Sequence, residues 1–255
     1  MATGRTKPKW IRVYSNGYDI SGYGRSIGPL AQGGNEVELT ATMGDTVKGY
    51  LKGHGITGAG VYNAVFDNTA TTGLHAVMGS ADTLRNIIVA YGIRAAPADG
   101  DPAFCGGFRQ SNYQVLDNAG AVVANAQFAG WDITAATLNY GVGWGQLLHA
   151  NAEETGANAA NGYDNLTAAA SAKGGYMVYQ VLAGDGTATI SVDDSANNAA
   201  WLALAGATSG AIDCSNPTSG IIPLGVTATV RQYLRWQLAL GTATTVTFVL
   251  AFVRG

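Results

Sequence analysis

The stretch TATVRQYLRWQLAL, from Thr227 to Leu240, is followed after GTATT by VTFVLAFV, from Val246 to Val253. Apolar residues recur at every second position in both stretches, which is the spacing of side chains on one face of a β-strand. The intervening Gly241–Thr245 has the small and polar residues of a turn. This part of the chain therefore predicts two strands joined as a β-hairpin.

Similar strand patterns recur along the rest of the chain, at Trp10–Tyr14, Glu36–Thr42, Asn86–Ile93, Phe108–Leu116, Val122–Trp131, Tyr176–Leu182 and Thr187–Val192. One helix is expected where capping residues from Asp67 precede Leu74, Val77 and Met78 at helical spacing, with Gly79 as its stop. Short strands with Gly-rich turns predict a mainly β chain. We expect a β-sandwich or barrel with one short helix, followed by a second β-sandwich section.

A change of composition suggests where these two sections meet. Residues 141–162, GVGWGQLLHANAEETGANAANG, are rich in Gly, Ala and Asn and can bury little apolar surface. We therefore expect a first domain at 1–140, a loop or linker at 141–164 and a C-terminal β-sandwich at 165–255.

The chain carries few charges for its size. Of its 255 residues 12% are Asp, Glu, Lys or Arg, about half the share usual in soluble globular proteins. Such a surface suits contact with other protein, which favours a building block of an assembly. The net charge of −3 argues against a protein that grips nucleic acid through a broad basic face.

The basic residues are unevenly spread. Arg5, Lys7, Lys9 and Arg12 place four positive charges in the first twelve residues without an acid. Two interpretations remain open: a solvated terminus, or an arm that docks on an acidic surface of an adjacent subunit.

No catalytic, cofactor-binding or metal-binding constellation stands out, so we do not expect an enzyme. The three histidines, His54, His75 and His149, are far apart in sequence, and Asp193-Asp194 lacks the ligand spacing of a calcium loop. Cys105 and Cys214 form no CxxC pair, which favours free thiols while leaving one disulfide possible.

Membrane insertion is not expected either. The most apolar stretch, Thr245–Val253, is about half of the ~20 residues that a spanning helix requires. The first residues lack the apolar centre of a signal peptide, so we expect production in a cytoplasm.

The segment EVELTATMGDTVKGYLKGHGITGAGVYNAVFD, Glu36–Asp67, resembles the major tail (tail-tube) proteins of long, non-contractile-tailed bacteriophages. The resemblance lies in an Asp-containing turn, a Tyr-Leu-x-Gly segment, a strand ending in Phe-Asp, a short helix and a late strand. These elements are Gly44–Thr46, Tyr50–Gly53, Val61–Asp67, Thr72–Met78 and Gly107–Val115. Segments of the second half resemble the β-sandwich of phage tail and virion-surface proteins: Gly175–Tyr179, Ala188–Ser195, Trp201 and Val230–Arg235.

This resemblance implies a structural virion protein of the tail, made in the host cytoplasm, that forms stacked six-subunit rings. Its partners would be copies of itself and other tail proteins, with DNA only as passing cargo. Joining the sheets of adjacent subunits into one barrel would remove exposed β edges.

In such a tube, the polar face of the strand Glu36–Thr42 could line the channel. Val37, Leu39 and Ala41 would then pack on the subunit's own core, and the opposite face would repel phosphate; that face comprises Glu36, Glu38, Thr40 and Thr42. The alternative is that this face meets solvent outside the tube.

Two other functions fit the same composition. A capsid decoration or other virion-surface protein would also be β-rich and poor in charge. A carbohydrate-binding module would need exposed aromatic residues, for which Trp131, Trp144, Trp201 and Trp236 are the candidates.

Overall fold

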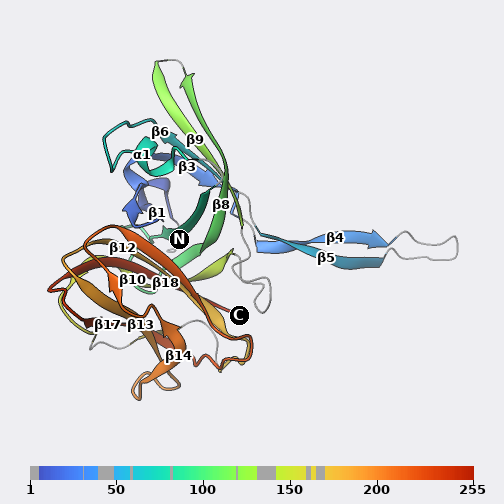
Figure 1. Ribbon diagram of the computed structural model, residues 1–255. Coiled ribbons are helices and arrows are strands. Elements are labelled where there is room, and N and C mark those ends of the chain that lie inside the picture. Colours follow the sequence, from blue (N-terminus) through green and yellow to red (C-terminus); the bar gives the residue numbers. More distant parts are fainter. Residues whose placement is uncertain are drawn as a thin grey trace, which may run out of the picture.

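The structure is a computed structural model of the 255-residue chain that describes residues 6–30, 32–39, 49–57, 60–80, 83–118, 120–130, 142–158, 162–164 and 170–255. It is mainly β with one short α-helix, which confirms the predicted fold class (Figure 1). The elements up to residue 130 are η1 (Pro8–Trp10), β1 (Ile11–Ser15), β2 (Tyr18–Asp19), η2 (Ser21–Tyr23), β3 (Gly24–Gly28), β4 (Gln32–Leu39), β5 (Gly49–Thr57), β6 (Gly60–Val65), α1 (Leu74–Met78), β7 (Thr83–Tyr91), β8 (Pro102–Asn118) and β9 (Ala121–Gly130). Those that follow are β10 (Val142–Glu154), β11 (Tyr163–Asp164), β12 (Gly175–Gly184), β13 (Thr187–Ser195), β14 (Leu202–Thr208), β15 (Ile212–Asp213), β16 (Thr218–Pro223), β17 (Tyr233–Leu240) and β18 (Val246–Arg254).

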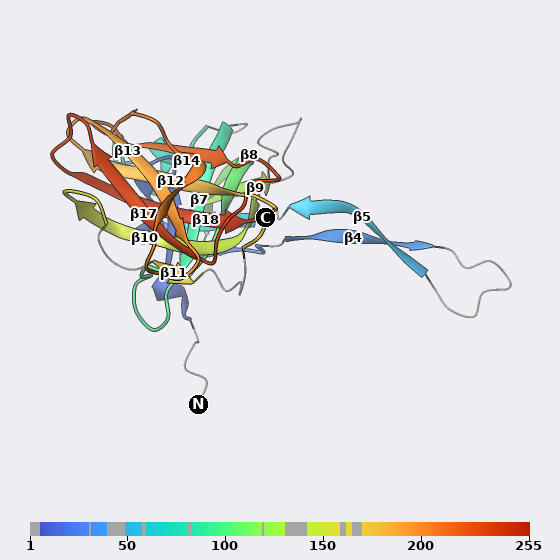
Figure 2. The ribbon, with the colours of Figure 1, turned by 90° about the horizontal axis from the view of Figure 1, so that it is seen from below.

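Most strands belong to one 11-stranded antiparallel sheet. Its order is β16-β12-β18-β10-β8-β7-β1-β2, and β9, β6 and β3 extend it from the far part of β8. A five-stranded sheet, β11-β17-β13-β14 with β15 on β13, packs against its C-terminal part (Figure 2). β4 and β5 pair only with each other. The large sheet is not a closed barrel, because its ladder ends at β16 and β2.

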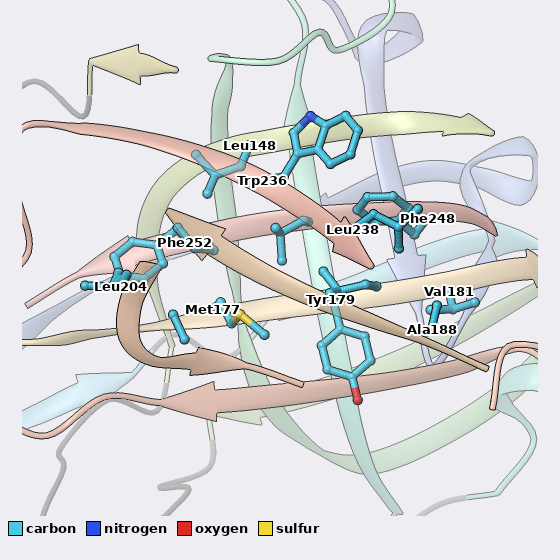
Figure 3. Close-up of a cluster of buried hydrophobic side chains, with 14 of the residues drawn as sticks. Leu148, Met177, Tyr179, Val181, Ala188, Leu204, Trp236, Leu238, Phe248 and Phe252 are labelled. Atoms are coloured by element: carbon cyan, nitrogen blue, oxygen red, sulfur yellow. The ribbon is translucent and has the colours of Figure 1, made fainter. Parts of the chain in front are cut away.

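The C-terminal sandwich core forms between the two sheets (Figure 3). Trp236 and Leu238 of β17 meet Phe248 and Leu250 of β18, with 5.6 Å between the ring centroids of Trp236 and Phe248. The predicted strand Val246–Val253 is confirmed, while of Thr227–Leu240 only the part from Tyr233 forms a strand. The predicted hairpin is wrong, because β17 and β18 lie in different sheets and face each other. The alternating pattern shows which side chains of a strand point inward. It does not show whether the next strand pairs with it in the same sheet or packs against it from the opposite sheet.

β12 and β13 are connected in the same way, and the two crossing turns are bonded together. An Asp185 carboxylate oxygen accepts hydrogen bonds from the backbone N–H groups of Thr244 and Thr245, at 2.7 and 3.2 Å. The Thr187 N–H donates to Thr242 Oγ1 at 2.9 Å. These contacts satisfy backbone groups where the chain leaves one sheet for the other.

The N-terminal half has its own core. α1 buries Leu74, Val77 and Met78 against a cluster that includes Phe104 and Phe128 of the sheet. The helix begins and ends close to the predicted positions, with Gly79 as its C-cap. β8 and β9 form the expected hairpin, in which Asn118 lies opposite Ala121.

The expected linker at 141–164 is wrong for most of its length, because Val142–Glu154 is the strand β10. Its first part pairs with β8, with Val142 opposite Gly106, and its later part pairs with β18, with Gln146 opposite Phe252. Leu147 and Leu148 are fully buried, on opposite faces. Glycine and alanine can fill a crowded central strand where larger side chains would collide, so their abundance does not indicate a loop.

The large sheet curls until strands of both halves face each other across a third core cluster. In it, Ile88 and Ala90 of β7 lie with Val178 of β12 and Val249 of β18. The Tyr176 hydroxyl donates to the carbonyl of Cys105 at 2.9 Å, which ties β12 to β8. Both halves are therefore one packed unit.

A buried polar network joins the two ends of the curled sheet. Gln180 of β12, with no exposed surface, accepts a hydrogen bond from the Gly17 N–H at 2.6 Å and donates to the Asn86 carbonyl at 2.8 Å. The Asn86 N–H donates to Asn16 Oδ1 at 2.9 Å. The Asn16-Gly17 turn between β1 and β2 thus docks on the other end of the sheet.

This arrangement predicts that residues 1–140 alone will not fold stably. The fragment would lack β10, β12 and β18, which cover Ile88, Ala90 and Ala103. We expect no cooperative melting by circular dichroism and a poorly dispersed amide NMR spectrum, with the full chain as control. A folded fragment with a sharp transition would show instead that the halves are independent. That residues 1–140 carry the assembling function stays a prediction.

Candidate assembly surfaces

The β4–β5 hairpin stands away from the body of the molecule in both views (Figures 1 and 2). In its register Glu36 lies opposite Lys52 and Glu38 opposite Tyr50, while Thr40 and Thr42 lie outside the described residues. Neither strand pairs with a described strand of the main sheets. That Val37, Leu39 and Ala41 pack on the subunit's own core stays a prediction. The alternating sequence predicted a strand with one apolar and one polar face. Alternation does not show which surface covers the apolar face.

An arm of this kind is poorly stable by itself. A lone two-stranded hairpin is marginal in water, and each of its strands has an outer edge of unpaired backbone N–H and C=O groups. Pairing or packing against another protein surface would satisfy those groups. The arm is therefore a candidate surface for contact with another protein.

A second surface lies at the tip of the β8–β9 hairpin. Val123 of β9 lies opposite both Val65 of β6 and Leu116 of β8, so the three aliphatic side chains form a row across one face. Val65 is 42% exposed and Leu116 47% exposed. Val123 between them is buried, and Val115 and Val122, which are similarly exposed, lie on the opposite face of the hairpin. Grouped exposed aliphatic residues are typical of interaction sites.

Of the predicted basic residues near the N-terminus, Lys7, Lys9 and Arg12 lie in the described part of the chain, while Arg5 lies outside it. The ammonium groups of Lys7 and Lys9 lie 5.8 and 5.4 Å from the ring centroid of Trp10. Nη1 of Arg12 donates to the carbonyls of Lys9 and Ile11, both at 3.1 Å. The described part of the predicted arm is thus held against the body.

These residues border a pocket of about 200 Å³ between η1, β1 and β3, which we call the basic pocket. It is lined by Lys9 and Arg12, and by Arg25 of β3. The register between β3 and β6 shifts between Gly24 and Ser26, so Arg25 is the extra residue of a β-bulge. Bulges redirect side chains. Arg25 was not among the predicted residues, since a single arginine in a Gly-rich stretch gives no signal of its spatial neighbours.

The floor of the basic pocket is neutral. Tyr62 is buried there, and its hydroxyl donates to the Ile20 carbonyl. Burial, with a smaller contribution from Asp19, raises the pKa of Tyr62, so the phenol stays uncharged. The nearest acid, Asp19, accepts hydrogen bonds from the N–H and hydroxyl of Ser21.

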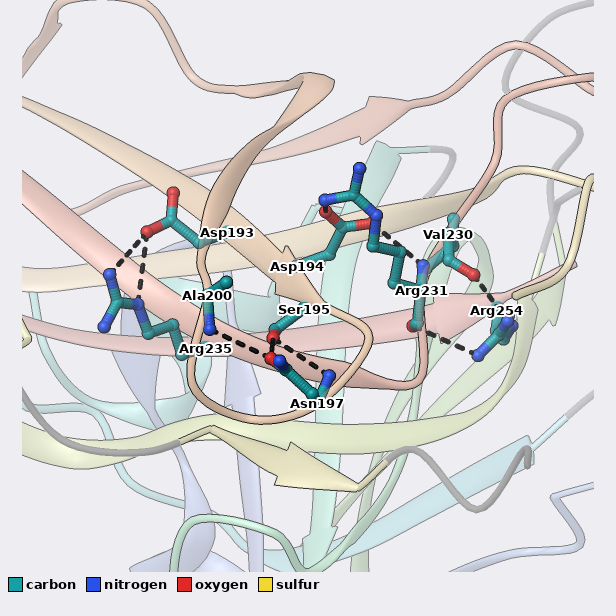
Figure 4. Close-up of polar contacts among 9 residues, drawn as sticks. All are labelled: Asp193, Asp194, Ser195, Asn197, Ala200, Val230, Arg231, Arg235 and Arg254. Carbon is teal, nitrogen blue, oxygen red and sulfur yellow. Dashed lines mark hydrogen bonds and ion pairs between the residues drawn. The ribbon is translucent and has the colours of Figure 1, made fainter. Parts of the chain in front are cut away.

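Two arginines of the C-terminal half are, in contrast, paired within the chain (Figure 4). Nη2 of Arg235 lies 2.9 Å from Asp193 Oδ2, and Nη1 of Arg231 lies 3.3 Å from Asp194 Oδ1. Asp193-Asp194 of β13 therefore pairs with Arg235 of β17 and with Arg231, which comes just before that strand. Within the described part of the chain, Lys9, Arg12 and Arg25 form no ion pair of this kind.

His149 lies in the core, near Glu154 and Asp99. His149 Nε2 lies 3.1 Å from Glu154 Oε1, and Nδ1 lies 3.0 Å from the Phe248 carbonyl. Its ring stacks on Phe248 at a centroid distance of 4.0 Å and is 2% exposed. Burial raises the pKa of the neighbouring Asp99. Because His149 is enclosed on both faces, this group stabilises the core and does not form an open site.

The tryptophans proposed for sugar binding are mostly not available. Trp236 is buried in the core, Trp201 lies under the Arg235 guanidinium at 4.5 Å, and Trp131 lies outside the described residues. Trp144 is 44% exposed beside Tyr91 and Phe104. A multi-tryptophan sugar platform is therefore not formed by the three described tryptophans.

The described residues contain no group of three or more His, Cys, Asp or Glu side chains placed to hold a metal ion. They also contain no helix long and apolar enough to cross a membrane. Cys105 and Cys214 are both buried free thiols.

Comparison with protein-family models and with curated protein sequences found no match. Among solved structures, the chain is similar to that described as "Crystal Structure of SPP1 Dit (gp 19.1) Protein, a Paradigm of Hub Adsorption Apparatus in Gram-positive Infecting Phages". The match has 9% sequence identity and covers 95% of this chain and 98% of that chain, with a TM-score of 0.34. At that TM-score, the likeness does not establish a shared fold or role.

Proposed function

We propose that this chain is a structural protein of a bacteriophage virion, which assembles with copies of itself into stacked six-membered rings of a tail tube. Other tail proteins would bind the ends of the tube, and DNA would pass through it. The sequence resemblance of Glu36–Asp67 to tail-tube proteins suggests this function, and the assembly surfaces support it.

The observation that carries the proposal is the β4–β5 arm. It projects from the body and pairs only with itself, so its outer edges and its apolar face need cover (Figure 1). A second copy of the chain is the simplest cover for both the edges and the apolar face, since repeated head-to-tail contacts between copies close into a ring. The aliphatic row at the β8–β9 tip offers a second contact of suitable chemistry.

The charge of the chain suits a channel for DNA. With 17 acids and 14 basic residues besides histidine, a ring of copies repels phosphate overall, and DNA slides where few phosphates are neutralised. We retain Glu36, Glu38, Thr40 and Thr42 as candidate channel residues. Glu36 and Glu38 belong to β4 of the arm, so they reach the channel only if the arm lines it.

Removing the arm should abolish assembly and leave the body folded. Leu30 and Gly60, which flank it, are close in space, because a Cβ built on Gly60 would lie 3.3 Å from Leu30 Cδ2. Residues 32–57 can therefore be replaced by a short Gly-Ser linker. We expect the full chain to form hollow tubes in negative-stain electron micrographs and the variant to remain monomeric by sedimentation.

The control is thermal unfolding of the variant, which should keep a cooperative transition because the arm adds no strand to the main sheets. Tubes formed without the arm would contradict its role. Closed particles or trimers of the full chain would favour a capsid decoration protein, and single molecules at all concentrations would contradict self-assembly.

A further inference from the structure

In the basic pocket, three cationic side chains from separate elements line one cavity and form no ion pair with a described residue. Lys9 comes from η1, Arg12 from β1 and Arg25 from the β3 bulge. Like charges held together repel one another, and an anion between them would relieve that repulsion. We propose that the basic pocket binds a carboxylate presented by a second copy of this chain. The inference rests on the proposed self-assembly.

Arg12 is held in place before any ligand arrives, by its two hydrogen bonds to the carbonyls of Lys9 and Ile11. The backbone around it is also tied down, because the Gly92 N–H donates to the Trp10 carbonyl at 3.0 Å. Lys9 and Arg25 are exposed side chains that a ligand would have to order. Holding Arg12 in advance lowers the ordering cost of binding for this one group.

The chemistry points to an oxyanion of small size. Guanidinium groups match the two oxygens of a carboxylate, and a cavity of about 200 Å³ admits the end of a side chain. The Ser21 hydroxyl already donates to Asp19, and the Tyr62 phenol is bonded and neutral. The cations are therefore the groups of the pocket that remain to attract a ligand.

A second copy fits this site better than DNA does. Few further basic residues extend the positive surface beyond the pocket, and the chain as a whole carries a net negative charge. Outside the pocket, the chain therefore repels a polyphosphate such as DNA. A copy of the chain presents exposed carboxylates, such as that of Glu153, which forms no ion pair with a described residue. Charge complementarity of this kind fixes register between subunits.

The test compares the double variant Arg12→Gln/Arg25→Gln with Arg94→Gln, which removes an exposed arginine outside the pocket. Assembly of the full-length proteins is followed by sedimentation and electron microscopy at low and high salt. We expect the double variant to need at least about a tenfold higher concentration to assemble at low salt, with the control within about twofold of wild type. Raising the salt concentration should weaken wild-type assembly and leave the double variant little changed.

Three results would overturn the inference. Tubes formed by the double variant at the wild-type concentration would remove the pocket from assembly while leaving the proposed function intact. Normal assembly with lost affinity for a short DNA duplex would make the pocket a phosphate site. Failure of the wild type to assemble under any condition would overturn the proposed function and this inference together. Matching melting temperatures of the variants ensure that misfolding is not the cause.

Discussion

Replacing Gly17 by alanine is expected to lower the free energy of unfolding by about 2–5 kcal/mol, from strain in the left-handed region together with overpacking. Gly17 has φ +85°, and a Cβ there would lie 2.5 Å from Thr218 N and 2.7 Å from Val181 O. Both are backbone atoms of the opposite end of the curled sheet, so relief requires the two ends to separate. That movement would also break the hydrogen bond from Gly17 to Gln180.

The matched control is Gly120→Ala. Gly120 has a similar φ of +91°, but no heavy atom lies within 4 Å of its added Cβ. It carries the conformational strain alone, so we expect a loss of only about 1–2 kcal/mol. Chemical denaturation of both variants measures the difference. Equal losses would show that the Asn16-Gly17 turn is not tightly docked.

The second large effect is expected for Phe248→Ala, which should destabilise the chain by about 3–5 kcal/mol. Phe248 is fully buried in the C-terminal core, stacks on His149 at 4.0 Å and meets Trp236 edge-on at 5.6 Å. Its removal leaves a cavity and frees one face of a buried imidazole that is bonded to Glu154. The loss should appear as a lower denaturation midpoint and a lower melting temperature.

The neighbouring Thr247→Ala serves as control on the same strand. Thr247 alternates to the other face of β18 and is half-buried, so we expect a change of at most about 0.5–1 kcal/mol. A similar loss for both variants would mean that strand propensity, and not the packed ring, determines stability at this position.

The sequence predicted strands better than it predicted their partners. β18 is where alternation placed it, and β17 covers the second part of its predicted stretch. α1 follows its apolar spacing, but its N-cap is Gly73 and makes no side-chain capping bond. The pairing of β17 with β13, and of β18 with β12 and β10, depends on side chains that meet across a core from distant parts of the sequence. β10 was missed because glycine and alanine carry no strand signal until neighbouring strands enclose them.

The candidate surfaces were predicted in part. The cluster Lys7, Lys9 and Arg12 was visible as a charge run, while Arg25 joins it only through the pairing of β3 with β6. The strand at Glu36 was recognised by its alternation. That it projects as an arm is a property of the tertiary fold, since alternation looks the same on a projecting hairpin and on a strand of the body.

The central position of β18 sets the order of events during synthesis. This strand, Val246–Arg254, lies between β10 and β12, and its residues complete two of the three core clusters. A nascent chain that has not reached residue 246 leaves β10 and β12 without their shared neighbour, and long-range pairings of this kind form slowly. The two halves of the large sheet therefore cannot close over the core clusters that β18 completes until the segment Val246–Arg254 has been synthesised.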